Sequence, residues 1–418
     1  MSRARASGPL ALLFALAKAP EVFLTLFVFA GIYKTSPYLA LPGRLDWTAI
    51  MGGLALGTFL LRVLVVGKGV KLRFSRTDAY LLLLSLQVLV GLSYSLNLRY
   101  GLSLAVEFVL LGVFASYFFP RILAFFAPIQ DVIRNVQRTL VAIAIATAAL
   151  TLAEFGTAER AFAGSYLSWG YFLGVAIILA VVLRQMAGRW MRLVYSMAIP
   201  FLLVSLAMSQ ARGPVIGLAV ILAVIIFKKG IFPRRARLWL GVALLVMVTA
   251  MPFVLPSDTF WRISLLLQQD MGASVAARMD GWTVAARLYL KHPVLGIGTG
   301  SFRIFHETYG PPKVLSYPHN LFLGVAAETG TIGLVLVIGF LVSLFRCWRK
   351  SRCSWASRND RLLLAACLFV VGFFLIGDLF SGHLPSRQEL LFAGLTVAFA
   401  QQIDARGDPR MLTGTVAS

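Results

Sequence analysis

Long apolar segments recur along the whole of this 418-residue chain, and they limit what it can fold into. Such segments are long enough to cross the hydrocarbon core of a bilayer, which takes about 20 residues of helix. Lipid offers no hydrogen-bond partners, so only helices and closed barrels satisfy the backbone there, and the short alternating segments of a barrel are absent. The sequence therefore predicts an all-α polytopic membrane protein. We expect about twelve transmembrane helices, near residues 9–31, 47–66, 78–95, 101–119, 132–153, 165–183, 191–208, 213–227, 238–255, 319–345, 362–380 and 387–403.

The basic residues predict how these spans are oriented. Most of the 39 lysines and arginines fall in alternate connections, on the side that holds Arg3, Arg5 and the cluster from Arg346 to Arg361. Cytoplasmic loops carry such an excess, so we expect both termini in the cytoplasm. The same bias explains the net charge of +22, and we therefore expect the lipid bilayer as a partner and no nucleic acid. The first apolar run extends too far for a signal peptide, which predicts an uncleaved first span.

One segment outside the predicted spans is large enough to be a functional module. It covers about residues 256–318, between spans 9 and 10, within a single transmembrane domain of residues 1–418. The charge pattern places this loop on the outer side. A Ser–Asp pair at its start indicates one short helix, and a second amphipathic helix is predicted from Ser274 up to Pro293. A turn-rich connection through Pro311 and Pro312 then leads to the tenth span.

Several polar residues lie where the outer-side chain meets the spans. Arg212 begins the eighth span, where it could either bind an anion or extend to the interface as an isolated arginine. His319, at the mouth of the tenth span, could be a general base, a phosphate contact or an interfacial cap. Glu328 lies nine residues deeper, where an ionisable group is either functional or a support for neighbouring helices. The outer loop is slightly basic through residues such as Arg278, Arg287, Lys291 and Arg303, which suits an anionic ligand.

Three pieces of the chain, in this order, resemble the O-antigen ligase and polymerase superfamily of bacterial envelopes. The first is SQARGPVIGLAV, in which an arginine–glycine pair starts a span. The second is ARMDGWTVAARLYLKHPVLGIGTGSF, in which an arginine precedes a tryptophan and an "hPlxGxGxxxF" pattern. The third is PHNLFLGVAAETGTIGLVLVIGFL, which matches "HNxfLxxxxExGxxG" at the entry to a span. The proline after Arg212 and Gly213 departs from the pattern without disturbing the matched residues.

The resemblance is greatest to O-antigen ligases, and it implies a fold, an activity and a location. It implies a GT-C-like membrane glycosyltransferase of the bacterial inner membrane whose active site faces the periplasm. Such an enzyme transfers a polysaccharide from undecaprenyl diphosphate to the lipid A–core oligosaccharide, in lipopolysaccharide biosynthesis. The resemblance implies an undecaprenyl-diphosphate-linked O-antigen donor, a lipid A–core acceptor and an inverting reaction without metal or other cofactor.

The resemblance also implies roles for the matched residues. Arg212 and Arg278 would clamp the diphosphate, because arginine forks suit phosphate oxygens. His319 would be the general base that takes the proton from the acceptor hydroxyl, or else a group that orients the substrates. Tyr317 and Asn320 are expected to assist at the substrate, and Glu328 to hold the tenth span. The other expected substrate contacts are Arg287, Lys291 and Arg303.

Other functions remain open from the sequence. Polymerases of O-antigen share the three motifs and the donor, and differ in using another glycan chain as acceptor. A polysaccharide or lipid transporter would also have many spans and intramembrane charges, although the internal repeats of many transporters are not evident here. A non-enzymatic assembly scaffold is the third alternative.

Overall fold

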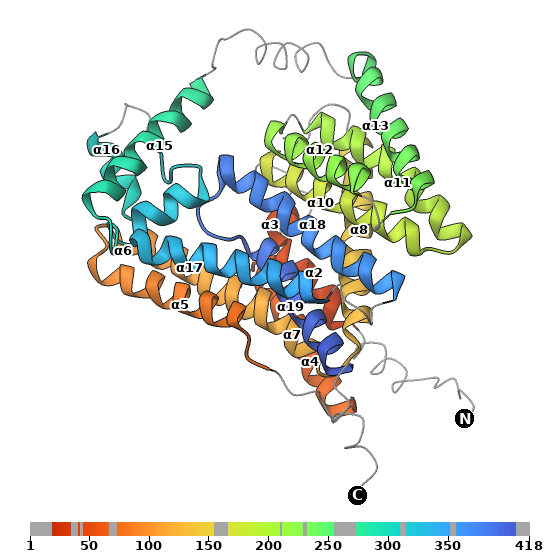
Figure 1. The fold of residues 1–418 in the computed structure, drawn as a ribbon, viewed down its shortest axis with the longest axis horizontal. Coiled ribbons are helices and arrows are strands. Elements are labelled where there is room, and N and C mark those ends of the chain that lie inside the picture. Colours follow the sequence, from red (N-terminus) through yellow and green to blue (C-terminus); the bar gives the residue numbers. More distant parts are fainter. Residues whose placement is uncertain are drawn as a thin grey trace, which may run out of the picture.

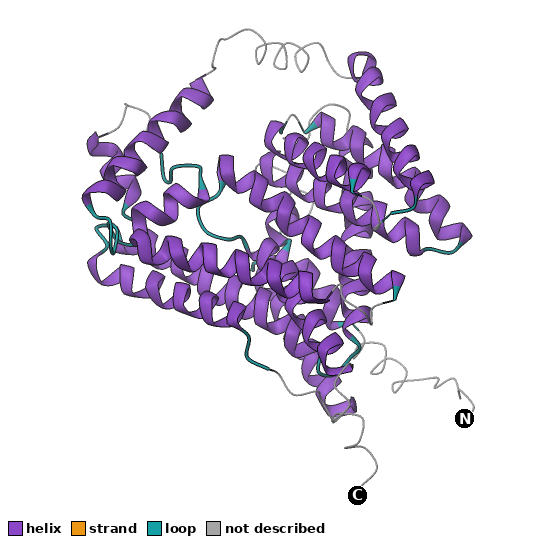
Figure 2. Ribbon diagram, in the orientation of Figure 1, coloured by secondary structure: helices purple, strands orange, loops and turns teal. Residues whose placement is uncertain are grey.

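The computed structural model describes residues 19–34, 41, 45–66, 73–153, 166–209, 211–228, 232–254, 273–309, 315–351 and 357–406. All regular structure in these ranges is helical, as Figure 2 shows, which confirms the all-α prediction. The helices are α2 (Pro20–Val28), α3 (Ala30–Tyr33), α4 (Trp47–Val66), α5 (Arg76–Val90), η2 (Gly91–Tyr94), α6 (Leu98–Ala105), η3 (Val106–Phe118), α7 (Phe119–Leu123), α8 (Ile129–Ala153), α10 (Tyr166–Met186), α11 (Arg189–Met208), α12 (Arg212–Phe227), α13 (Arg234–Val254), α15 (Ala273–Lys291), α16 (Phe302–Tyr309), α17 (Leu321–Ser351), α18 (Arg358–Ser381) and α19 (Arg387–Arg406).

Each of the twelve predicted apolar segments contains helix within the described residues. By length and hydropathy, seven helical stretches of the described chain could cross a membrane, and α12 is a shorter apolar helix. The seven stretches are Trp47–Val65, Arg76–Tyr94, Leu98–Leu123, Tyr166–Met186, Arg189–Met208, Leu321–Ser351 and Arg358–Ser381. These helices fit a polytopic membrane protein, while the count of twelve spans and the GT-C-like architecture stay predictions.

The centre of the assembly is formed by helices that are apolar on most faces. From Trp169 to Leu183, α10 is buried along almost its whole length, as expected of a helix without a polar face. α18 and α19 are similarly buried and pack beside each other and close to α10 and η3. In Figure 1, α17 lies along α5, while α15 and α16 lie at one end of the assembly, near α6.

The predicted outer loop is partly described. Its first predicted helix, after Ser257, lies outside the described residues, as do Pro311 and Pro312. The second predicted helix is confirmed as α15. The predicted turn-rich connection contains a helix that the sequence did not predict, α16, in which Phe302 and His306 are completely buried. A helix of two turns gives too few repeats for its periodicity to be evident between glycines and prolines.

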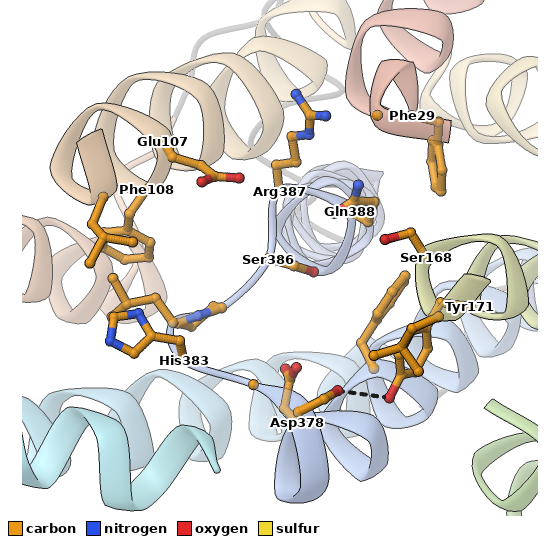
Figure 3. Close-up of a pocket in the computed structure, with 18 of the residues that line it drawn as sticks. Phe29, Glu107, Phe108, Ser168, Tyr171, Asp378, His383, Ser386, Arg387 and Gln388 are labelled. Carbon is orange, nitrogen blue, oxygen red and sulfur yellow. Dashed lines mark hydrogen bonds between the residues drawn. The ribbon is translucent and has the colours of Figure 1, made fainter. Parts of the chain in front are cut away.

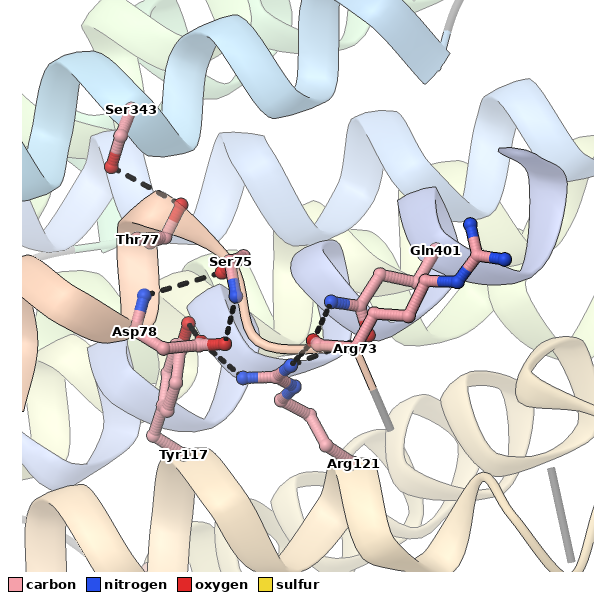
Figure 4. A network of polar contacts seen from close by, with 8 residues as sticks. All are labelled: Arg73, Ser75, Thr77, Asp78, Tyr117, Arg121, Ser343 and Gln401. Carbon is pink, nitrogen blue, oxygen red and sulfur yellow. Dashed lines mark hydrogen bonds and ion pairs between the residues drawn. The ribbon is translucent and has the colours of Figure 1, made fainter. Parts of the chain in front are cut away.

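A buried polar network joins α5, η3, α7, α17 and α19 near the C-terminal end of α19 (Figure 4). The Asp78 carboxylate forms an ion pair with Arg121 and accepts a hydrogen bond of 2.6 Å from the Tyr117 hydroxyl. Arg121 also donates to the side chain of Gln401 in α19, at 3.3 Å. Ser343 of α17 donates to Thr77 of α5, at 3.1 Å. The network therefore fixes α5, η3, α7, α17 and α19 relative to one another.

Removing one member of this network should be costly. The side chains of Asp78 and Arg121 are both 1% exposed, so Arg121→Ala leaves a carboxylate buried without its counter-charge. We expect the free energy of unfolding to fall by about 3–5 kcal/mol. Thermal unfolding of the purified protein in detergent measures this. The control is Arg134→Ala, whose pair with Asp131 is solvent-exposed and should contribute less than about 1 kcal/mol. Equal losses in both variants would contradict the prediction.

Candidate functional site

A cavity of about 650 Å³ lies among α3, α6, η3, α10, α18 and the beginning of α19 (Figure 3). Its wall combines apolar side chains with tyrosines and charged groups. The polar lining includes Lys34, Tyr100, Glu107, Ser168, Tyr171, Tyr317, Asp378, Ser381, His383, Ser386, Arg387 and Gln388. Figure 3 shows Glu107, Asp378 and His383 around the same open volume. A cavity of this size, with polar groups from distant parts of the chain, is suited to binding a small molecule or part of a larger one.

His319 lies next to this cavity and contacts Tyr317, one of the tyrosines that line it. The ring centroids of His319 and Tyr317 are 4.3 Å apart, and those of Tyr317 and His383 are 5.6 Å apart. His319 has a φ of 57°, and it is the one residue other than glycine with a positive φ in the described chain. Its Nδ1 is buried without a hydrogen-bond partner there. A side chain held in an uncommon backbone conformation, with an unpaired nitrogen, is a candidate for chemistry.

Arg278 lies near enough for its charge to act on His319, because a glycine lets α15 approach the chain before α17. A Cβ atom at Gly281 would lie 2.9 Å from the Leu315 side chain and 3.5 Å from the Pro318 backbone, so only glycine fits without adjustment. Arg278 precedes Gly281 by three residues and therefore lies on the same face of α15. Its positive charge acts on the pKa values of both His319 and Tyr317. The structure thus brings Arg278, Tyr317 and His319 together.

The glycine-rich piece GIGTGSF forms a loop that packs against a break in α17. Gly330 has a φ of 68° and interrupts the helix. The break leaves the carbonyl groups of Ala327 and Glu328 free to accept hydrogen bonds from Ile297 and Gly298, at 2.9 and 3.0 Å. Gly296, Gly298 and Gly300 all have positive φ values, which glycine adopts without strain. Two of the three motifs of the sequence therefore meet as one packing unit.

The Glu328 side chain accepts hydrogen bonds from the backbone of the same loop. One carboxylate oxygen accepts from the backbone N–H of Gly300 at 3.0 Å, and the other from that of Phe302 at 3.1 Å. His383 lies 3.3 Å from the carboxylate and connects it to the cavity wall. These contacts favour the supporting role predicted for Glu328.

Asn320 and Arg212 each lie at the start of a helix. The Asn320 side chain accepts from the N–H of Leu323 at 3.1 Å, as an N-cap residue does, and donates to the Leu379 carbonyl of α18 at 3.0 Å. Arg212 is the first residue of α12, as predicted, and its side chain is exposed. A Cβ at the neighbouring Gly213 would lie 3.3 Å from the Tyr171 hydroxyl. The beginning of α12 is therefore adjacent to a tyrosine of the cavity wall.

Comparison with known proteins identifies the region that carries these residues. The O-antigen ligase family model matches residues 197–338, which include Arg212, Arg278, His319 and Glu328. Residues 197–338 of this chain are therefore similar to the O-antigen ligase family. An O-antigen polymerase from Salmonella muenchen is 27% identical over 193 residues. That match covers 43% of this chain and 44% of the Salmonella protein, less than half the length of the relative. The resemblance seen in the three motifs is confirmed.

The remaining predicted contacts of the O-antigen ligase region lie apart from the cavity lining. Arg287 and Lys291 are exposed on α15. Arg303 is exposed on α16 and pairs with Glu307 at 3.3 Å. None of the three is among the described residues that line the cavity. Their contact with substrate stays a prediction.

Of the described polar residues that line the cavity, the sequence selected only Tyr317 as a site residue. Three of the residues that it did not select are His383, Asp378 and Arg387, which all lie beyond the O-antigen ligase family region. Asp378 gave the same signal as Glu328, because it is an acidic residue inside a long apolar segment. His383 and Arg387 lie in and next to the turn between α18 and α19, where a basic residue is common at a membrane interface.

The pKa of His319 leads to a prediction about acid inactivation. Burial, with the nearby charges of Arg278 and His383, lowers this pKa from 6.5 to about 4. The imidazole is therefore neutral at pH 7, and a step that needs neutral His319 should slow only as the pH falls towards 4. Removing the Arg278 charge raises the pKa, so Arg278→Gln should move His319 protonation to higher pH. NMR titration of the histidine ring protons measures this, and a His319 pKa near 6.5 in the wild type would contradict it.

Proposed function

We propose that this chain is a membrane glycosyltransferase of the O-antigen ligase type. It transfers a polysaccharide from undecaprenyl diphosphate to the lipid A–core oligosaccharide at the periplasmic face of the inner membrane. The observation that carries the proposal is the grouping of His319, Tyr317 and Arg278 beside the cavity. The family region and the three motifs support it independently.

In this proposal, His319 acts as the general base. The acceptor hydroxyl oxygen attacks the anomeric carbon of the donor sugar, and its proton passes to the neutral imidazole. The bond between the anomeric carbon and the diphosphate oxygen breaks, which inverts the configuration. The bound diphosphate places negative charge beside His319 and offsets the Arg278 charge that lowers the pKa of the imidazole. Donor binding therefore makes His319 a stronger base at the moment it is needed.

Arg278 and Arg212 would stabilise the leaving diphosphate. Arg278 approaches from α15 and Arg212 from the start of α12, so the two reach the substrate from different elements. Charge that develops on the leaving group is stabilised by guanidinium groups already in position. The backbone N–H groups at the beginning of α12 add a favourable field for an anion. Diphosphate release makes the transfer favourable without a nucleotide.

A second candidate is an O-antigen polymerase. The similarity to the Salmonella muenchen protein of that name favours it. Both reactions use the same lipid-linked donor, and they differ in whether the acceptor is lipid A–core or another glycan chain. The groups described above serve either acceptor equally well.

A reconstituted reaction distinguishes the two candidates. Purified protein in detergent is given lipid-linked glycan, with and without lipid A–core. Glycan joined to lipid A–core supports the ligase, whereas longer lipid-linked chains without lipid A–core support the polymerase. Formation of either product excludes a transporter without enzymatic activity. If neither product forms in either mixture, the proposed function is wrong.

A further inference from the structure

Two buried carboxyl groups of α18 and α19 face each other at the wall of the cavity. Asp378 lines the cavity and is 8% exposed, while Glu389 is fully buried behind it. Their side chains are within hydrogen-bonding reach of each other. Two neighbouring carboxyl groups cannot both stay ionised in a site that excludes water, because like charges repel strongly in a buried site.

Neither carboxyl has a basic partner to offset its charge. Within the described part of the chain, no lysine, arginine or histidine lies in ion-pair distance of Asp378 or Glu389. Asp378 Oδ2 and both carboxyl oxygens of Glu389 are buried, and besides Asp378 the backbone N–H of Ser386 is the described group that acts on the Glu389 carboxyl as a hydrogen-bond partner. One proton shared between the two carboxyls removes the repulsion and supplies the missing hydrogen bond. Glu389 has no access to the cavity, so it is the group that keeps the proton.

Asp378 is the group of the pair that is directed into the cavity (Figure 3), and it is a carboxylate whenever Glu389 holds the shared proton. Its only hydrogen-bond donor among the described residues is the protonated Glu389. A carboxylate accepts several hydrogen bonds, so Asp378 retains capacity for donors from a ligand. Sugar hydroxyls are such donors.

The rest of the wall also fits a saccharide better than a simple anion. Glu107 and Arg387 also line the cavity, where the Glu107 carboxylate acts on the charge of Arg387. The cavity therefore offers an acceptor and a donor besides Asp378, as hydroxyl groups require, because each hydroxyl both donates and accepts. The rings of Tyr100, Tyr171 and Tyr317 provide the apolar surface between them.

We propose that Asp378, positioned by a protonated Glu389, binds hydroxyl groups of a saccharide in this cavity. The inference rests on the proposed function, since it assigns the cavity to a sugar unit of the donor or the acceptor. Glu389 is a positioning residue, and it acts through Asp378 without touching the saccharide.

The first test is the reconstituted transfer reaction with four variants. Asp378→Asn removes the charge of the hydroxyl acceptor, and we expect the KM for one saccharide substrate to rise at least about tenfold. Glu389→Gln keeps a hydrogen-bond donor towards Asp378, so its KM should stay within about threefold of the wild-type value. Glu389→Leu removes that donor, so its KM should rise by about as much as that of Asp378→Asn. The exposed Asp131→Asn is the matched control for loss of a carboxylate.

The outcomes separate the sources of the saccharide. A raised KM for lipid A–core assigns the cavity to the acceptor, and a raised KM for the lipid-linked glycan assigns it to the donor. Unchanged KM values for both substrates in Asp378→Asn would overturn the proposal. A rise in KM for Glu389→Gln as large as that for Asp378→Asn would also overturn it, because an ionised Glu389 would then be required. If the wild type forms no product, the proposed function fails instead.

Infrared spectroscopy tests the shared proton without any substrate. The wild type at neutral pH should show the carbonyl band of a buried protonated carboxylic acid, and Glu389→Gln should lose it. Glu107→Gln, which changes a carboxyl exposed to the cavity, should keep the band. A band that survives in Glu389→Gln would show that the proton resides elsewhere and would overturn the role of Glu389.

Discussion

Replacing His319 with alanine is expected to abolish sugar transfer, with kcat falling at least about 100-fold. The imidazole is the neutral base in the proposed reaction, and its Nδ1 has no protein partner within the described residues that would be left unpaired. Folding should therefore be retained, because alanine keeps the Cβ atom and leaves the cost of the positive φ at this position little changed. Steady-state transfer with purified protein, normalised to the monodisperse fraction, measures the loss.

The control is His292→Ala, which removes an exposed histidine from the end of α15. Arg278→Ala and Arg212→Ala should lower kcat by a factor of about 100 to 1,000, because each removes stabilisation of the leaving group. If His319→Ala keeps a third or more of the wild-type activity, the base is another group and the assignment is wrong.

The second large effect concerns the break in α17. Gly330→Ala adds a Cβ that would overlap the Val294 carbonyl oxygen, at a φ that already disfavours any other residue. The loop from Val294 to Gly298 must then move away and lose its hydrogen bonds to Ala327 and Glu328. We expect a destabilisation of more than about 4 kcal/mol, combining strain with lost packing.

Thermal unfolding in detergent, followed by size-exclusion chromatography, measures this effect. The matched control is Gly57→Ala in α4, where a Cβ meets no atom within 4 Å. There the substitution should be neutral or stabilise slightly, because alanine favours helix over glycine by about 1 kcal/mol. A Gly330→Ala protein as stable as the wild type would show that the loop does not depend on the break.

Most helices could be predicted from the sequence, because each apolar segment is long and uninterrupted. The boundaries of α4 and α12 follow the predicted segments closely, and the serine and proline around α15 predicted its ends. The sequence did not predict α16 or the break at Gly330. Both depend on contacts between the loop and α17, which are far apart along the chain and leave no local periodicity.

The candidate site was predictable in part, and the reason differs from residue to residue. His319 and Arg278 were found through motifs, and the structure brings them together through the close approach at Gly281. Asp378 carried a signal in the sequence, as an acidic residue in an apolar segment. Its pairing with Glu389 carried none, because it depends on how the turn after Gly382 brings α19 alongside α18.

The packing of GIGTGSF against α17 has a consequence for how relatives are classified. The glycines and Glu328 build a scaffold whose hydrogen bonds do not involve His319 or Arg278. A descendant that lost both of these residues would keep the scaffold, and its motif profile would change at only two positions. Such a pseudoenzyme would still match the family by sequence. The histidine after Tyr–Pro must therefore be checked by itself before any homologue is assigned a transferase activity.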